Sequence, residues 1–184
     1  MLTGHHWRMT SVEAAIAGRL VDIAAKACGR NHRHSCARSS VLKEEMVVVT
    51  SGNHPLTRTR TIESKSLRRY PFVLFESGSN TRKVLDEFFL EEQIPVNVVM
   101  QTENVEIIKA MVASGLGVTL LPYSAIAGEL RTGRFAWARV RARRLYRETG
   151  WVFPRSEYLP RSVTEVQRVF DLMKRQFGGK PPGR

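Results

Sequence analysis

The chain has 184 residues, which is enough to bury a hydrophobic core in one large domain or two small lobes. It carries a formal net charge of +12, yet no apolar run approaches the ~20 residues that a membrane-spanning helix requires. The N-terminus has no basic start followed by an apolar stretch, so we expect no secretory signal and a cytoplasmic location.

The first 45 residues show the weakest pattern of the chain. Ser11–Ala17 is compatible with a short helix that has Ser11 as its N-cap, and Leu20–Ala24 with the start of a strand. From Lys26 to Ser40 the sequence is rich in His, Arg, Ser and Cys and has no periodicity. This composition predicts a loop or disorder.

The same stretch contains four potential zinc ligands, Cys28, His32, His34 and Cys36. Their Cys-x3-His-x-His-x-Cys spacing is shorter than the paired spacings of structural zinc sites, and no rigid element carries it. Two cysteines close together in a polar stretch do not suggest a disulfide framework. We therefore expect neither a bound metal nor a cofactor.

Regular alternation of strands and helices begins at residue 46. Met46–Thr50 is a β-rich run followed by turn residues, and Phe72–Phe75 is an apolar run typical of a buried strand. A helix is predicted from Arg82 to Gln93, because apolar residues recur there at helical spacing. Val96–Met100 is the next expected strand.

The most informative stretch runs from residue 102 to residue 122. Asn104 can serve as the N-cap of a helix, and Gly115 and Gly117 can end it. Val118–Leu121 follows as an apolar run that predicts a buried strand. The apolar face of the helix comprises Val105, Ile108, Met111 and Val112.

Beyond Tyr123 we expect two strands and one long helix. The strand candidates are Phe135–Val140 and Trp151–Phe153. The helix begins with a capping box formed by Ser162 and Glu165. Its apolar stripe comprises Val163, Val166, Val169, Phe170, Met173 and Phe177. Because strands alternate with helices throughout, the sequence predicts an α/β fold with largely parallel strands.

Most of the positive charge lies in the last third of the chain. Residues 124–184 carry 14 basic and 5 acidic side chains. Such a stretch could attract nucleic acid or acidic ligands. It lacks the interleaved aromatic residues of a stacking platform, and no helix-turn-helix or zinc-finger pattern is present. A solvated, arginine-rich strand and loop is the favoured interpretation.

Two strand-to-helix junctions carry small polar residues. Ser77 to Thr81 follows a strand and opens a helix, so its hydroxyls and the first helix amides converge on a point that accepts anions. Glu103 and Asn104 stand at an equivalent junction and would be neighbours in a parallel sheet. Each residue could instead serve only as a helix cap, which is the commoner role at such positions. No triad, carboxylate pair or phosphate loop with its lysine is visible, so we do not expect an enzyme.

Several motifs then occur in a recognisable order. They are His54-Pro55-Leu56, Ser77-x-Ser79-x-x-Arg82-x-x-Leu85-Asp86, and Glu106-x-Ile108-x-x-Met111-Val112-Ala113-Ser114-Gly115-Leu116-Gly117-Val118-x-x-Leu121-Pro122. The segment from Gly150 to Pro160 and the helix at Ser162 follow them. In this order the chain resembles the effector-binding domain of LysR-type transcriptional regulators, well over residues 46–177 and loosely over about 10–25.

The resemblance implies a periplasmic-binding-protein-like fold of two lobes, with mainly parallel sheets and the effector in the cleft between the lobes. Residues 46–147 would form the second lobe. Residues 148–177 would return to the first lobe with the C-terminal helix, and residues 178–184 would be a disordered tail. Residues 1–45 would be a partial remnant of the first lobe with a disordered loop, which leaves that lobe incomplete.

The resemblance also implies a site and partners. In this family small polar residues at strand-to-helix junctions hold the effector, which here means Ser79, Asn80, Thr81 and Asn104, with Ser11 as a further candidate. The implied assembly is a homodimer or tetramer, in which the helix that carries Phe88 would lie near an interface. We expect no membrane contact, and DNA binding only through a helix-turn-helix that is not present in these residues.

The chain departs from the family pattern because the helix-turn-helix, the linker helix and the start of the first lobe are not visible. We therefore expect a truncated member. The predicted function is effector sensing, in which a small, anionic metabolite binds to control transcription. The alternative is a stand-alone solute-binding protein of the same fold.

Overall fold

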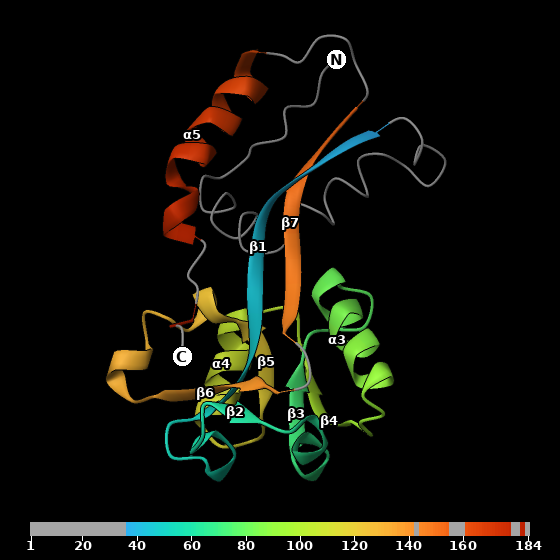
Figure 1. Cartoon of the computed structure of the whole chain (residues 1–184), viewed down its shortest axis with the longest axis vertical. Helices are drawn as coiled ribbons and strands as arrows, with labels where there is room; N and C mark the ends of the chain where they lie inside the picture. The colour runs from blue at the N-terminus through green and yellow to red at the C-terminus, as the bar shows by residue number, and fades with distance from the viewer. Residues whose placement is uncertain (1–35, 142–143, 155–160, 178–180, 183–184) are drawn as a thin grey trace, which may run out of the picture.

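The computed structural model describes residues 36–141, 144–154, 161–177 and 181–182. The helix expected at Ser11–Ala17, the strand expected at Leu20–Ala24 and the segment from Cys28 to His34 lie outside the described residues. The described elements form a compact body, from which a ribbon of two long strands extends toward the C-terminal helix (Figure 1).

The strands are β1 (Cys36–Ser51), β2 (Thr61–Ile62), β3 (Pro71–Leu74), β4 (Asn97–Gln101), β5 (Thr119–Pro122), β6 (Phe135–Val140) and β7 (Leu145–Pro154). The α-helices are α3 (Asn80–Glu91), α4 (Val105–Ala113) and α5 (Arg161–Phe177). Short 3-10 helices are η2 (Pro55–Thr57), η3 (Ser64–Arg69), η4 (Tyr123–Ala125) and η5 (Leu130–Thr132). The strands and helices expected between residues 46 and 140 are confirmed, with ends shifted by a few residues at most, except that β1 begins at Cys36 instead of Met46.

Strand β1 organises the body because it changes partners along its length. From Cys36 to Met46 it pairs with β7, and from Met46 to Ser51 it pairs with β5 on one side and β6 on the other. All three pairings are antiparallel. The sheet order is β2-β6-β1-β5, with β7 also bonded to β1.

The strand directions are therefore mixed rather than mainly parallel. The parallel pairings are β2 with β6, β3 with β4, and a bridge between Phe72 and Val118. The α/β class is confirmed, but periodicity could not report the direction of β1. That direction follows from β6 and β7, which return along β1 in succession after the chain has passed through the body.

Two local expectations were wrong. Residues 36–40, expected as loop or disorder, belong to β1, because their backbone pairs with β7 and a paired ribbon needs no apolar alternation. The second concerns Ser162, the expected N-cap of the last helix. It lies within α5, where Glu165 is ion-paired with Arg168 at 2.9 Å instead of capping.

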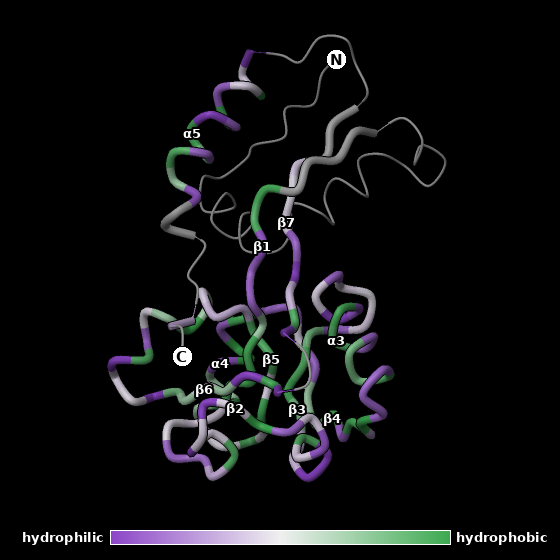
Figure 2. The backbone as a smooth tube through the Cα atoms, in the orientation of Figure 1, coloured by the Kyte–Doolittle hydropathy of each residue, from purple (hydrophilic) through white to green (hydrophobic). Residues whose placement is uncertain are grey.

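The hydrophobic core lies in the body, around β1, β3 and β5 (Figure 2). Its fully buried side chains include Val47, Val48 and Val49 of β1, Leu85 and Phe88 of α3, and Ile108 and Val112 of α4. Hydrophilic residues replace them where the β1–β7 ribbon leaves the body (Figure 2). The buried run of valines anchors one end of a ribbon that is otherwise held by its backbone hydrogen bonds.

The apolar stripe expected on the last helix is present but largely exposed. Val166 and Val169 are 56% and 46% exposed. Phe170 is buried, and its ring lies 5.5 Å from that of Trp151 on β7. This edge-to-face contact joins α5 to the ribbon.

The turn between α4 and β5 depends on two glycines for different reasons. Gly115 has a φ of +83°, which a residue with a side chain adopts only with strain. Gly117 lies against β3, and a Cβ at this position would stand 2.5 Å from the carbonyl oxygen of Pro71. That carbonyl accepts a hydrogen bond from the N–H of Val118 at 2.8 Å. The missing side chain lets β5 approach β3.

Gly117→Ala is expected to lower the free energy of unfolding by about 1–3 kcal/mol, because the methyl group forces β3 and the start of β5 apart. Chemical denaturation measures the change. Gly128→Ala is the matched control, since a Cβ there meets nothing within 4 Å. Equal stability of the two variants would contradict the close approach.

His54 is expected to make stability depend on pH. Its Nδ1 accepts a hydrogen bond from the N–H of Leu56 at 3.2 Å, and burial lowers its pKa below the usual 6.5. Because the folded state favours the neutral ring, this contribution is complete above pH 6.5 and is lost as the pH falls through the lowered pKa. His54→Asn retains a capping acceptor but does not titrate. Its unfolding free energy, measured from pH 7.5 to 5, should therefore fall less than that of the parent chain.

Candidate functional site

The two polar strand-to-helix junctions lie side by side, as the sequence predicted. Strands β3 and β4 are parallel, and Leu74 is in register with Gln101 at their C-terminal ends. The N–H of Thr102 donates to the carbonyl oxygen of Leu74 at 3.2 Å. The segments that open α3 and α4 therefore leave the same edge of this strand pair.

The first junction is held by Ser79 and Arg82. The Ser79 hydroxyl oxygen accepts from the N–H of Arg82 at 3.1 Å and so caps α3. The Arg82 guanidinium donates to the carbonyl of Phe75 at 2.8 Å and to Oε1 of Gln101 at 3.2 Å. Ser77 donates to the same Gln101 oxygen at 3.3 Å. Gln101 thus links the opening of α3 to the end of β4.

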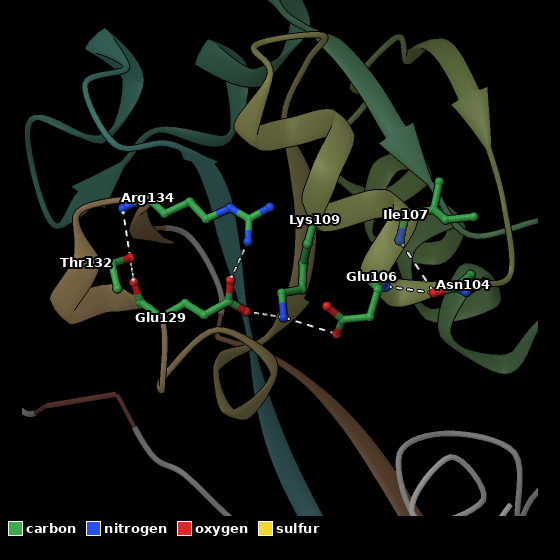
Figure 3. Close-up of polar contacts among 7 residues, drawn as sticks. All are labelled: Asn104, Glu106, Ile107, Lys109, Glu129, Thr132 and Arg134. Atoms are coloured by element: carbon green, nitrogen blue, oxygen red, sulfur yellow. Dashed lines mark hydrogen bonds and ion pairs between the residues drawn. The ribbon is translucent and has the colours of Figure 1, made fainter. Parts of the chain in front are cut away.

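The second junction is capped by Asn104 (Figure 3). Its Oδ1 accepts from the N–H groups of Glu106 and Ile107 at 2.8 and 3.4 Å, which confirms the expected N-cap. The side chain is exposed. Capping occupies the amide oxygen and leaves the Nδ2 donor without a hydrogen bond in the part of the chain that the structure describes.

A chain of charges follows on the same helix (Figure 3). Lys109 is buried, and its ammonium group is ion-paired with Glu106 at 3.1 Å and with Glu129. Glu129 also contacts Arg134 at 3.0 Å. Burial opposes the charged form of Lys109, but the hydrogen bonds that it donates to Glu129 and Glu106, together with the attraction of their charges, outweigh burial and raise its pKa. Lys109 therefore stays charged, and the two carboxylates around it balance that charge within the fold.

Thr81 connects α3 to the ribbon. It is buried, and its hydroxyl accepts a hydrogen bond from Nη1 of Arg147 on β7 at 3.3 Å. Arg147 contacts Oε2 of Glu44 on β1 through Nε and Nη2, both at 2.8 Å. The other oxygen of Glu44 accepts from the hydroxyl of Ser124 at 2.6 Å. This buried polar cluster of Glu44, Thr81, Ser124 and Arg147 lies where the ribbon meets the body.

Sequence reasoning did not find three members of this cluster. Arg147 was noted only as one of many basic residues, and Glu44 and Ser124 were not considered. Glu44 and Arg147 are opposite each other in the antiparallel register of β1 and β7. The two residues are 103 positions apart, so the sequence does not indicate their contact until the register of β1 and β7 is known.

Of the proposed effector contacts, Ser79, Asn80 and Thr81 open α3, and Asn104 opens α4 at the neighbouring strand end. Ser11 lies outside the described residues. Within residues 36–141, 144–154, 161–177 and 181–182, no three His, Cys, Asp or Glu side chains are grouped to hold a metal ion. No helix in these ranges is sufficiently long and apolar to cross a membrane.

Residues 8–178 match the sequence model of the LysR substrate binding domain. The chain belongs to this family. The match includes both candidate junctions, the buried polar cluster and α5.

Two relatives of this LysR-type domain are transcriptional regulators. The RuBisCO operon transcriptional regulator of Acidithiobacillus ferrooxidans is 36% identical over 126 residues, which are 68% of this chain and 41% of that protein. The transcriptional activator CmpR of Synechocystis is 37% identical over 95 residues, which are 52% of this chain and 31% of CmpR. The matched region therefore spans less than half the length of either regulator.

Solved structures agree with the fold of a LysR-type effector-binding domain. The regulatory domain of CcmR from Synechocystis PCC6803, in complex with 2-PG, superimposes with a TM-score of 0.71 at 18% identity. That alignment covers 82% of this chain and 73% of the CcmR domain. The cofactor-binding domain of the Cbl regulator gives a TM-score of 0.66 at 15% identity and covers 95% of this chain and 78% of that one.

Asn104→Ala is expected to lower the free energy of unfolding by about 1 kcal/mol, because the α4 amides lose their capping oxygen. Asn104→Asp should retain the parent stability, since a carboxylate caps as well and favours the positive end of the helix. Thermal and urea denaturation of both variants checks this pair of outcomes. Equal destabilisation by alanine and aspartate would show that the cap does not stabilise the fold.

Proposed function

We propose that this LysR-type domain senses a small anionic metabolite for a transcriptional regulator. The observation that carries the proposal is the buried contact of Thr81 with Arg147 at the start of α3. Arg147 supplies a guanidinium, and the first turn of a helix supplies N–H groups and a partial positive charge. Both favour a carboxylate or a phosphate.

The proposed contacts are Ser79, Asn80 and Thr81 on α3 and Asn104 on α4, with Ser11 contributed from the first lobe. The neighbouring ends of β3 and β4 support this assignment, because they carry both sets of polar residues on one edge. The ion pairs of Lys109 support it as well. With Lys109 held by two carboxylates, Arg147 is the better-placed cation for an anion at the α3 junction.

The first effector to test is 2-phosphoglycolate. It carries a phosphate and a carboxylate, and the CcmR domain of similar fold is described as a complex with 2-PG. Relatives of higher identity include a regulator of the RuBisCO operon and CmpR. These likenesses support the choice of an acidic metabolite over a neutral one.

The wider proposals rest on family membership. We propose that residues 46–147 act as the second lobe and that residues 148–177 return to the first. We also propose a homodimer or tetramer in the cytoplasm, with no enzymatic activity. A stand-alone solute-binding protein is the weaker alternative, because the named relatives are transcriptional regulators.

A ligand screen followed by a paired substitution tests the site. We expect 2-phosphoglycolate to raise the melting temperature of the chain and to give a measurable Kd by calorimetry. Replacing two hydroxyls together, Ser79→Ala with Thr81→Val, should weaken binding by roughly tenfold or more, since hydrogen bonds to a charged group are the strong ones.

The matched control is the double variant Ser114→Ala with Thr132→Ala, which removes two exposed hydroxyls that bond to nearby backbone groups. Its affinity should equal that of the parent chain. The proposal fails if no carboxylate, sulfate or phosphorylated sugar stabilises the chain. The site assignment fails if the two double variants bind equally well.

A further inference from the structure

Strand β1 carries two adjacent buried glutamates, Glu44 and Glu45, whose accessibilities are 5% and 7%. Successive side chains of a strand point to opposite faces, so the two carboxylates have different neighbours. Each is paired with its own arginine, Glu44 with Arg147 of β7 and Glu45 with Arg139 of β6. Two buried ion pairs of the same type therefore lie on opposite sides of one strand.

Within the described residues, only the Glu44 pair of these two is hydrogen-bonded to α3, the helix that opens at the proposed effector site. Arg147 directs Nε and Nη2 to Glu44 and Nη1 to Thr81 on α3. Arg139 instead donates to the carbonyls of Pro181 and Pro182 at 3.2 and 3.1 Å. The Glu44–Arg147 pair thus joins both strands of the ribbon to α3, while the Glu45–Arg139 pair joins the sheet to the C-terminal segment.

Thr81 lies near one positive and one negative side chain, Arg147 and Glu44. A guanidinium near the positive end of α3 is unfavourable unless a negative group lies nearby. Glu44 supplies that group, so the buried pair has no net charge. An anion that reaches Thr81 would meet the same guanidinium, and it would be attracted by Arg147 and repelled by Glu44.

We propose that the Glu44–Arg147 pair sets the affinity of the site for anions and passes effector binding to the β1–β7 ribbon. An anionic oxygen of the effector replaces the Thr81 hydroxyl as the acceptor of Arg147 Nη1. Glu44 keeps its contacts with Nε and Nη2 of Arg147, and its negative charge competes with the effector for the guanidinium. This inference rests on the proposed function, because it assigns roles within the same site.

The proposal requires opposite effects from the two halves of one ion pair. Glu44→Gln removes a repulsive charge and should tighten 2-phosphoglycolate binding by roughly three- to tenfold, a conservative allowance for one charge at an effective dielectric constant of 20. Arg147→Gln removes the attractive charge and should weaken binding by about tenfold or more. Calorimetry on the 184-residue chain gives both values.

The second ion pair provides matched controls. Glu45→Gln and Arg139→Gln break a buried pair of the same type, so they should destabilise the fold in a similar way. Their affinities for 2-phosphoglycolate should remain within about twofold of the parent value, since the hydrogen bonds and ion pairs of both residues within the described ranges go to groups outside α3. A change of affinity in these controls as large as that at Glu44 or Arg147 would overturn the assignment.

If a single variant does not fold, the double variant Glu44→Gln with Arg147→Gln still tests whether the ion pair affects the affinity for 2-phosphoglycolate. It leaves no unbalanced buried charge, which is the costly feature of a broken pair. We expect it to bind 2-phosphoglycolate about tenfold or more weakly than the parent chain. A purely structural pair predicts unchanged affinity, and that result would overturn the proposal.

Hydrogen exchange tests the link to the ribbon. At saturating 2-phosphoglycolate, amide exchange in residues 36–46 and 145–151 should slow in the parent chain and not in Arg147→Gln. Equal slowing in both would refute coupling through Arg147. Binding by the parent chain without tightening in Glu44→Gln refutes this inference alone. Failure of the parent chain to bind any of the anions tested refutes both this inference and the proposed function.

Discussion

The structure depends on the backbone pairing of β1, which belongs to the body and to the ribbon at once. At Met46 the strand is in register with Pro122 of β5 and Leu145 of β7, and from there it enters the core as a run of buried valines. The strand is therefore paired on both sides at the end in the body and on one side along the ribbon. Whatever contacts the ribbon where it leaves the body therefore acts on both parts.

Charged side chains are buried where the ribbon meets the body. Glu44 and Glu45 are buried next to each other, and each has an arginine from a neighbouring strand. Buried ion pairs stabilise little compared with packed apolar side chains, because desolvation offsets the attraction. Their presence beside the proposed effector site is understandable if the charges take part in binding, since an anion can exchange with a carboxylate as the partner of a guanidinium.

The polar residues of the proposed site already make different interactions within the fold. Ser79 and Asn104 are caps, and their oxygens are committed to the amides of α3 and α4. Lys109, the cation nearest to the second junction in sequence, is ion-paired with Glu106 and Glu129. Arg147 reaches the same region from β7 and brings its charge to α3.

The sequence by itself determined the local elements of the body and the polar character of both junctions. The spacing of apolar residues predicted α3 and α4, and Asn104 was recognisable as the N-cap of α4. Gly115 and Gly117 indicated the turn into β5. All of these signals depend on neighbours within a few positions in the sequence. Tertiary structure alone decided that residues 36–40 form a strand, that β1 is antiparallel to its partners, and that Glu44 faces Arg147 and Thr81. The physical reason is that strand register brings together side chains with no local relation, and a charged residue reveals its partner only when the opposing strand is in place.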